Sequence, residues 1–106
     1  MTTDRRLGPR KKIALEVMVK HRRLGLLSCE TRDISLDGAY VETRNLALRK
    51  NAKVDLVLMI PAKGKTQQHR IAAKVVSVEK HGVTFIFRNL DETTYSALVD
   101  LLYPAK

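Results

Sequence analysis

Short segments in which apolar residues recur at every second position are the feature that most limits the folds open to this chain. In residues 13–20, Leu15, Val17 and Val19 show the period of two that is expected of a β-strand with one buried face. Further short segments rich in β-branched and aromatic residues follow, each bounded by residues that favour turns. The six predicted strands are residues 13–20, 26–34, 39–43, 54–60, 71–78 and 83–87.

Polar, glycine-containing stretches connect these segments. Gly25 and residues 35–38 predict tight turns, so the first three strands should form an antiparallel meander. Residues 44–51 are irregular and basic, and residues 61–67 are predicted to be a polar hairpin loop. Residues 81–82 turn the chain into its last strand.

The end of the chain changes to a helical period. Apolar side chains recur at spacings of three and four, and either Asp91 or Glu92 can cap the start of a helix. Many short antiparallel strands followed by one helix indicate a mainly β fold, a six-stranded antiparallel β-barrel plugged or flanked by a C-terminal α-helix. The predicted apolar face of that helix holds Tyr95, Leu98, Val99 and Leu102.

The chain has 106 residues, enough for one hydrophobic core and one domain. It contains no apolar run near the roughly 20 residues of a transmembrane helix, and its amino terminus is polar and basic. A single cysteine, Cys29, has no partner for an internal disulfide or a thiolate metal site, and we interpret it as a small packing residue. We therefore expect a monomeric cytoplasmic protein that does not insert into membranes.

The charge of the chain is strongly positive, with 20 Lys and Arg against 11 Asp and Glu and a formal net charge of +9. Residues 1–12 lack apolar periodicity and contain Gly8 and Pro9, which predicts a flexible basic arm followed by a barrel domain over residues 13–106. An anionic partner fits this charge, although basic runs are more often solvated segments than binding sites.

Nothing in the sequence indicates catalysis. His21, His69 and His81 lie far apart at predicted strand ends or turns, and each is expected at the surface. The sequence has no nucleophile elbow, no paired-acid signature and no glycine-rich phosphate loop. The chain is therefore predicted to bind rather than to catalyse, with no metal and no cofactor.

Two short motifs frame the first two predicted strands. Arg6 and Arg10 form an R-x-x-x-R pattern before the first strand, and Asp33, Ser35 and Gly38 form a D-x-S-x-x-G pattern after the second. An antiparallel hairpin brings these two places to the same end of the barrel, within side-chain reach of each other. The sequence therefore predicts a binding site made of two parts.

The residue types of these motifs suit an anionic ligand that carries guanine. An arginine pairs with guanine O6 and N7 or with phosphate oxygens, and its flat face stacks on purines. An aspartate accepts from the guanine N1–H and N2–H₂ groups, and the hydroxyl and amides of a tight turn serve phosphate or sugar oxygens. Gly38 is expected to adopt a positive φ and to permit close approach. For the hexapeptide from Asp33 to Gly38 alone, an Asx turn with an ordinary hairpin glycine is the simpler interpretation.

The two motifs, in this order and at this separation, resemble the PilZ domain, the bacterial receptor module for cyclic di-GMP. The resemblance covers nearly the whole chain and implies a six-stranded barrel with a C-terminal helix, in which the N-terminal arm holds the ligand against one face. It implies that Arg6 and Arg10 grip guanine edges and phosphates. It also implies that Asp33 and Ser35 hold a guanine and its neighbouring phosphate, and that Gly38 shapes the turn.

Arg5 stands immediately before the R-x-x-x-R pattern. In PilZ domains this position is associated with ligand stoichiometry, and an additional arginine there is similar to variants that bind two mutually intercalated cyclic di-GMP molecules. Two ligands bring about four negative charges and extra guanine faces, which a third guanidinium can neutralise and stack upon. The simpler alternative is that Arg5 is a solvated residue of the arm.

The leading hypothesis is a cyclic di-GMP receptor whose arm changes conformation on ligand binding and which signals to a protein partner. One alternative is a small basic barrel that binds nucleic acid, although the chain has few aromatic residues for base stacking. The other is a PilZ-like adaptor that keeps the fold for protein interaction and needs no ligand.

Overall fold

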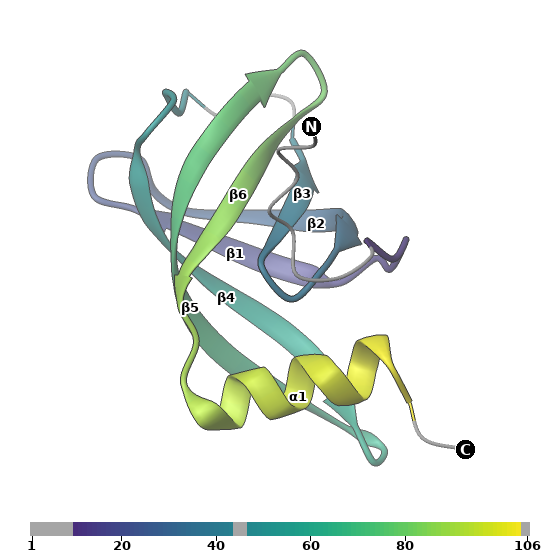
Figure 1. Cartoon of the computed structure of the whole chain (residues 1–106). Helices are drawn as coiled ribbons and strands as arrows, with labels where there is room; N and C mark the ends of the chain where they lie inside the picture. Colours follow the sequence, from purple (N-terminus) through teal and green to yellow (C-terminus); the bar gives the residue numbers. More distant parts are fainter. Residues whose placement is uncertain (1–9, 44–46, 105–106) are drawn as a thin grey trace, which may run out of the picture.

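The fold is seen in a computed structural model that describes residues 10–43 and 47–104, which form six strands and one helix (Figure 1). Neighbouring strands are antiparallel and close into a barrel in the order β1-β2-β3-β6-β5-β4. The predicted six-stranded antiparallel barrel with a C-terminal helix is confirmed, and so is the meander of the first three strands. The elements are β1 (Glu16–His21), β2 (Gly25–Ile34), β3 (Gly38–Glu42), β4 (Lys53–Ala62), β5 (Lys65–Glu79), β6 (Gly82–Asn89) and α1 (Glu92–Leu102).

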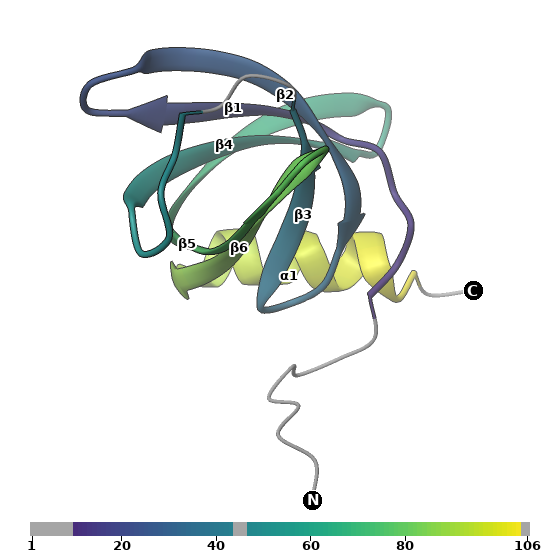
Figure 2. The same ribbon diagram turned by 90° about the horizontal axis from the view of Figure 1, so that it is seen from above.

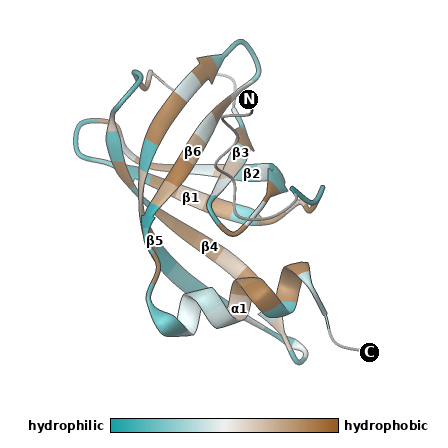
Figure 3. Cartoon of the chain, viewed as in Figure 1, coloured by the Kyte–Doolittle hydropathy of each residue, from teal (hydrophilic) through white to brown (hydrophobic). Residues whose placement is uncertain are grey.

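The interior of the barrel is filled by the alternate side chains that the period of two predicts. Val17 and Val19 of β1 are fully buried and flank Met18, which is only half-buried because it points to the outer face. Phe85 of β6 is fully buried, and Cys29 of β2 packs against the same core. Figure 3 shows hydrophilic residues at the β1–β2 and β5–β6 turns and hydrophobic residues within the strands.

The β4–β5 hairpin is longer than the sequence predicts. The prediction of a polar loop over residues 61–67 is wrong, because the two strands meet in a two-residue turn at Lys63 and Gly64. Both turn residues have positive φ, 51° and 80°, as a turn that follows the twist of its strands requires. Pro61 fits within β4 because the pairing with β1 ends at Leu58, which leaves Pro61 in an edge segment that needs no donor on that side.

Helix α1 packs against β4 and β5 and lies across one end of the barrel (Figures 1 and 2). Its N-cap is Asp91, whose side chain accepts a hydrogen bond from the Thr94 backbone N–H at 2.8 Å. This hydrogen bond stabilises the carboxylate and lowers the pKa of Asp91. No helix within the described part of the chain is long and apolar enough to cross a membrane.

The buried face of α1 differs from the predicted one at two positions. Val99 is only half-buried, and the partly buried helix residues that pack against the core are instead Ala97 and Leu101. Leu98 and Leu102 are buried as predicted, but Tyr95 is 48% exposed and Thr94 is buried in its place. The reason is His69, which is 7% exposed and whose Nδ1 lies 3.2 Å from Thr94 Oγ1. The prediction of a surface position for His69 is therefore wrong: β5 begins six residues earlier than predicted, and its alternation turns His69 inward beneath the helix.

Candidate functional site

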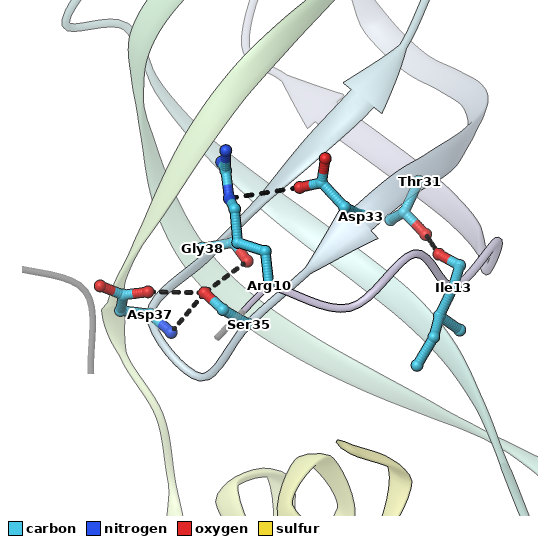
Figure 4. Close-up of polar contacts among 7 residues, drawn as sticks. All are labelled: Arg10, Ile13, Thr31, Asp33, Ser35, Asp37 and Gly38. Atoms are coloured by element: carbon cyan, nitrogen blue, oxygen red, sulfur yellow. Dashed lines mark hydrogen bonds and ion pairs between the residues drawn. The ribbon is translucent and has the colours of Figure 1, made fainter. Parts of the chain in front are cut away.

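The turn between β2 and β3 is held by hydrogen bonds of its own residues (Figure 4). The Ser35 hydroxyl donates to Asp37 Oδ1 at 2.6 Å, and the Ser35 backbone N–H donates to the Gly38 carbonyl at 2.9 Å. The Phe87 backbone N–H of β6 donates to the Asp37 carbonyl at 2.9 Å. Ser35 is fully buried, so its hydroxyl holds the turn together rather than facing the solvent.

Gly38 begins β3 and lies against the backbone of β6. The prediction of a positive φ at Gly38 is wrong, because the positive-φ glycines of the described chain are Gly25 and Gly64. The prediction of a close approach is correct, since a Cβ added at Gly38 would lie 2.4 Å from the Phe85 carbonyl oxygen. Glycine is therefore required here for packing between two strands, which a side chain would separate.

The chain segment that leads into β1 runs beside the end of β2. Lys11 and Ile34 form an isolated antiparallel bridge, with each backbone N–H donating to the other residue's carbonyl at 2.9 Å. This bridge places Arg10 next to Asp33, and Arg10 Nε lies 3.3 Å from Asp33 Oδ1. The expected meeting of the arm's root with the Asp33 turn is thus observed at Arg10.

A β-bulge at Arg32 sets the direction of the Asp33 side chain. The pairing of β2 with β3 shifts by one residue between Thr31 and Asp33. Without that shift Asp33 would share the inner face with Thr31, which is buried, because alternate residues of a strand face the same way. The bulge instead turns Asp33 outward toward Arg10, and the exposed fraction of its side chain is 20%.

The carboxylate of Asp33 has acceptor capacity that the protein does not use. Its Oδ1 atom is shielded from solvent and accepts no hydrogen bond of suitable geometry from residues 10–43 and 47–104, although Arg10 Nε lies within ion-pair distance. A shielded carboxylate oxygen without a donor is unfavourable, because desolvation is then not compensated by hydrogen bonding. The site can therefore gain free energy by receiving N–H donors from a ligand.

Thr31 is a positioning residue that the sequence reasoning missed. It is 2% exposed, and its hydroxyl donates to the Ile13 carbonyl at 2.7 Å and accepts from the Leu15 backbone N–H at 2.8 Å. These bonds replace a regular ladder, which is why β1 begins at Glu16 and not at residue 13 as predicted. The sequence does hold a signal for this role, because Thr31 is a polar β-branched residue at an inward-facing strand position two residues before Asp33.

The exposed Arg32 next to the site is already paired with an acidic residue. Arg32, at the bulge, donates to Glu42 Oε2 from Nε at 2.8 Å and from a terminal nitrogen at 2.5 Å. This pairing with Glu42 raises the pKa of Arg32, and its guanidinium also lies 5.4 Å from the centre of the Tyr40 ring. Among the described arginines, Arg10 and not Arg32 is therefore the one directed at the Asp33 carboxylate.

Of the predicted site residues, four come together at one end of the barrel. Arg10 and Asp33 face each other at the arm's root, while Ser35 and Gly38 build the turn beside them (Figure 4). The predictions for Arg5 and Arg6, and most of the proposed arm, lie outside the described residues.

Comparison with known proteins yields one family. A family model described as the PilZ domain matches residues 4–103. Among solved structures, the inhibitor of motility MotI/DgrA of Bacillus subtilis superposes with a TM-score of 0.81 and 18% identity, covering 92% of this chain and 49% of its own. The PilZ domain of CeSA from a cellulose-synthesizing bacterium superposes with a TM-score of 0.70 and 16% identity, covering 91% of this chain and 96% of its own. The curated proteins include no significant match.

These findings agree with the geometry described above. The chain spans about half the length of the MotI/DgrA chain, and at these identities the two structures show a shared fold. The family match extends over nearly the entire sequence and includes both the arginine motif and the Asp33 turn. The chain therefore belongs to the PilZ domain family.

Proposed function

We propose that this chain is a non-enzymatic receptor for cyclic di-GMP that passes the signal to a protein partner in the cytoplasm. The observation that carries the proposal is the pairing of Arg10 with Asp33 at the root of the arm, where Asp33 Oδ1 has no hydrogen-bond donor in the part of the chain that the structure describes. The guanine N1–H and N2–H₂ groups are donors that match a carboxylate, and the guanidinium matches guanine O6 and N7 or a phosphate. One ligand with both guanine and phosphate satisfies both side chains.

Ligand binding is proposed to rearrange the arm. Asp33 Oδ1 is shielded from solvent and Arg10 Nε lies 3.3 Å away, so we expect a guanine edge to reach that oxygen by displacing Arg10. The released guanidinium can then pair with the ligand's phosphate or guanine. In this proposal Arg6 joins Arg10 on the ligand, and the changed position of the arm is what a partner protein detects.

Ser35 and Gly38 are proposed to support the site from beneath. The Ser35 hydroxyl is bound to Asp37, so a direct contact with a ligand phosphate requires that hydrogen bond to be exchanged. Gly38 keeps β3 close to β6 and so holds the turn in position.

The test is an isothermal titration of the full chain with cyclic di-GMP, with GMP as the control ligand. We expect saturable binding of cyclic di-GMP that is lost in Arg6→Ala and Arg10→Ala while the circular dichroism spectrum stays native. Asp33→Asn should also lose binding, because its NH₂ group would face the guanine donors. Lys12→Ala removes one nearby exposed positive charge and should retain binding. Unchanged affinity in Arg10→Ala or Asp33→Asn would contradict the proposed site.

The same titration tests the stoichiometry. With Arg5 in place we propose that two ligands bind each chain, and that Arg5→Leu lowers the number toward one. A one-to-one endpoint for the unaltered chain would remove this part of the proposal and leave the receptor function intact.

A further inference from the structure

The outer face of the barrel carries a groove that the proposed ligand site does not use. It has a volume of about 780 Å³ and runs over β1, β4 and β5. None of its lining residues belongs to the Asp33 turn, and Leu26, which lines the groove, lies at the opposite end of β2 from Asp33. At about 3.3 Å per residue, the strand separates these two residues by roughly 23 Å.

The floor of the groove is apolar, which is unusual for the solvent side of a small barrel. Met18 and Val57 are directly paired between β1 and β4, and both point outward because their neighbours along the strands are buried. Leu26 is 57% exposed beside them. Neighbouring apolar side chains that are half-buried or exposed at a concave surface are typical of a binding site.

The rim of the groove is basic. Asp55 is its one acidic residue, and the ion pairs found within residues 10–43 and 47–104, Arg10–Asp33 and Arg32–Glu42, do not involve the rim. An adjoining hollow of about 720 Å³ adds Arg23 and Arg49. The basic residues of the groove itself are Lys20, Arg22, Lys53, Arg70 and Arg88.

We infer that this groove binds an acidic polypeptide segment that also carries apolar side chains, as part of a partner protein. Carboxylates of such a segment complement the unpaired cations, and its apolar side chains cover Met18, Val57 and Leu26. A single-stranded nucleic acid matches the charge but not the floor, because the lining holds no Phe, Tyr or Trp on which bases could stack. The inference goes beyond the proposed receptor function, since it assigns the surface through which the partner is held.

The test is selection of a random peptide library displayed on phage against the full chain, followed by fluorescence anisotropy with the enriched peptides. We expect enriched sequences that combine Asp or Glu with Leu, Val or Met. The double variant Lys20→Glu/Arg70→Glu should weaken their binding at least about tenfold. The control Lys65→Glu/Lys80→Glu carries the same charge change at exposed positions outside the groove and should bind as the unaltered chain does.

The apolar floor is tested separately by Leu26→Ser, which should weaken the same peptides without changing the melting temperature, because Leu26 is largely exposed. Enrichment of peptides without acidic residues, no enrichment, or equal binding to both double variants would overturn the inference. Tighter binding of a labelled oligothymidylate than of any enriched peptide, lost in Lys20→Glu/Arg70→Glu, would overturn it in favour of nucleic acid. Titration of Lys20→Glu/Arg70→Glu with cyclic di-GMP tests the receptor proposal separately. If this variant still binds cyclic di-GMP, failure of the groove inference leaves the receptor proposal intact.

Discussion

The two ends of the β1–β2 hairpin use charge in opposite ways. At the Asp33 end, Arg10 faces a carboxylate, and Ser35 and Asp37 form a hydrogen bond within a partly buried turn. At the other end, arginines and lysines border a partly exposed apolar floor, and no described ion pair involves them. Buried, paired groups contribute to both fold and binding, whereas exposed cations can be changed with little effect on stability. Substitutions at the Asp33 end should therefore affect both stability and ligand binding, whereas substitutions at the groove end should affect binding alone.

The largest effect is expected from Gly38→Ala at the Asp33 end. A Cβ there would lie 2.4 Å from the Phe85 carbonyl oxygen, so β3 and β6 must separate, at a cost of about 3 kcal/mol or more in the free energy of unfolding. The matched control is Gly64→Ala, where φ is 80° but no atom lies within 4 Å, and the expected cost is about 1 to 2 kcal/mol. Urea denaturation measures both, and equal costs would show that packing at Gly38 is unimportant.

The next effect concerns binding and compares the two ends directly. Arg10→Ala should abolish calorimetrically detectable binding of cyclic di-GMP, a loss of about 100-fold or more, as expected when charge-assisted hydrogen bonds are removed. The groove variant Lys20→Glu/Arg70→Glu should change this affinity by less than about threefold, because only long-range, screened charge is altered. Calorimetry measures both variants. Loss of cyclic di-GMP binding in the groove variant as complete as in Arg10→Ala would contradict the separation of the two ends.

A smaller effect is expected from Thr31→Val, which keeps the side-chain shape and removes the hydroxyl. It leaves the Ile13 carbonyl and the Leu15 N–H without their partners and should cost about 1 to 3 kcal/mol of stability. The control is Thr66→Val on the exposed part of β5, which should be nearly neutral. If the segment of residues 13–15 positions the arm, the affinity for cyclic di-GMP should fall together with stability. A fall in stability with unchanged affinity would show that Thr31 supports the fold and does not position the arm.

The smallest effect is expected away from both ends, at the N-cap of α1. Asp91→Ala should lower the melting temperature by a few degrees through the loss of the bond to the Thr94 N–H. Because the folded-state pKa of Asp91 is lowered, its contribution is present at neutral pH and is lost as the pH falls below the ordinary value of 3.8. Asp91→Asn should keep most of the cap and show less of this acid sensitivity, which melting curves at several pH values measure.

The failures of sequence reasoning have a common physical origin. Pro61 and the polar residues after it suggested a loop, yet they form strand because their outer side lies beyond the end of β1 and needs no ladder partner. His69 was expected at the surface, but helix α1 covers the inner face of that extended hairpin and supplies Thr94 as its partner. Both errors depend on which elements pack together, and local composition does not contain that information.

The amino-acid sequence by itself determined the number and order of the strands, the helix with its cap, and the two motifs, because alternation, capping and turn chemistry act over a few neighbouring residues. The tertiary structure alone decided which way the functional side chains point. The bulge at Arg32 turns Asp33 outward, the contact with Phe85 requires Gly38, and closure of the barrel places Met18 beside Val57 in the basic groove. Each of these depends on the register between strands distant in sequence, and a shift of one residue would send every side chain to the other face.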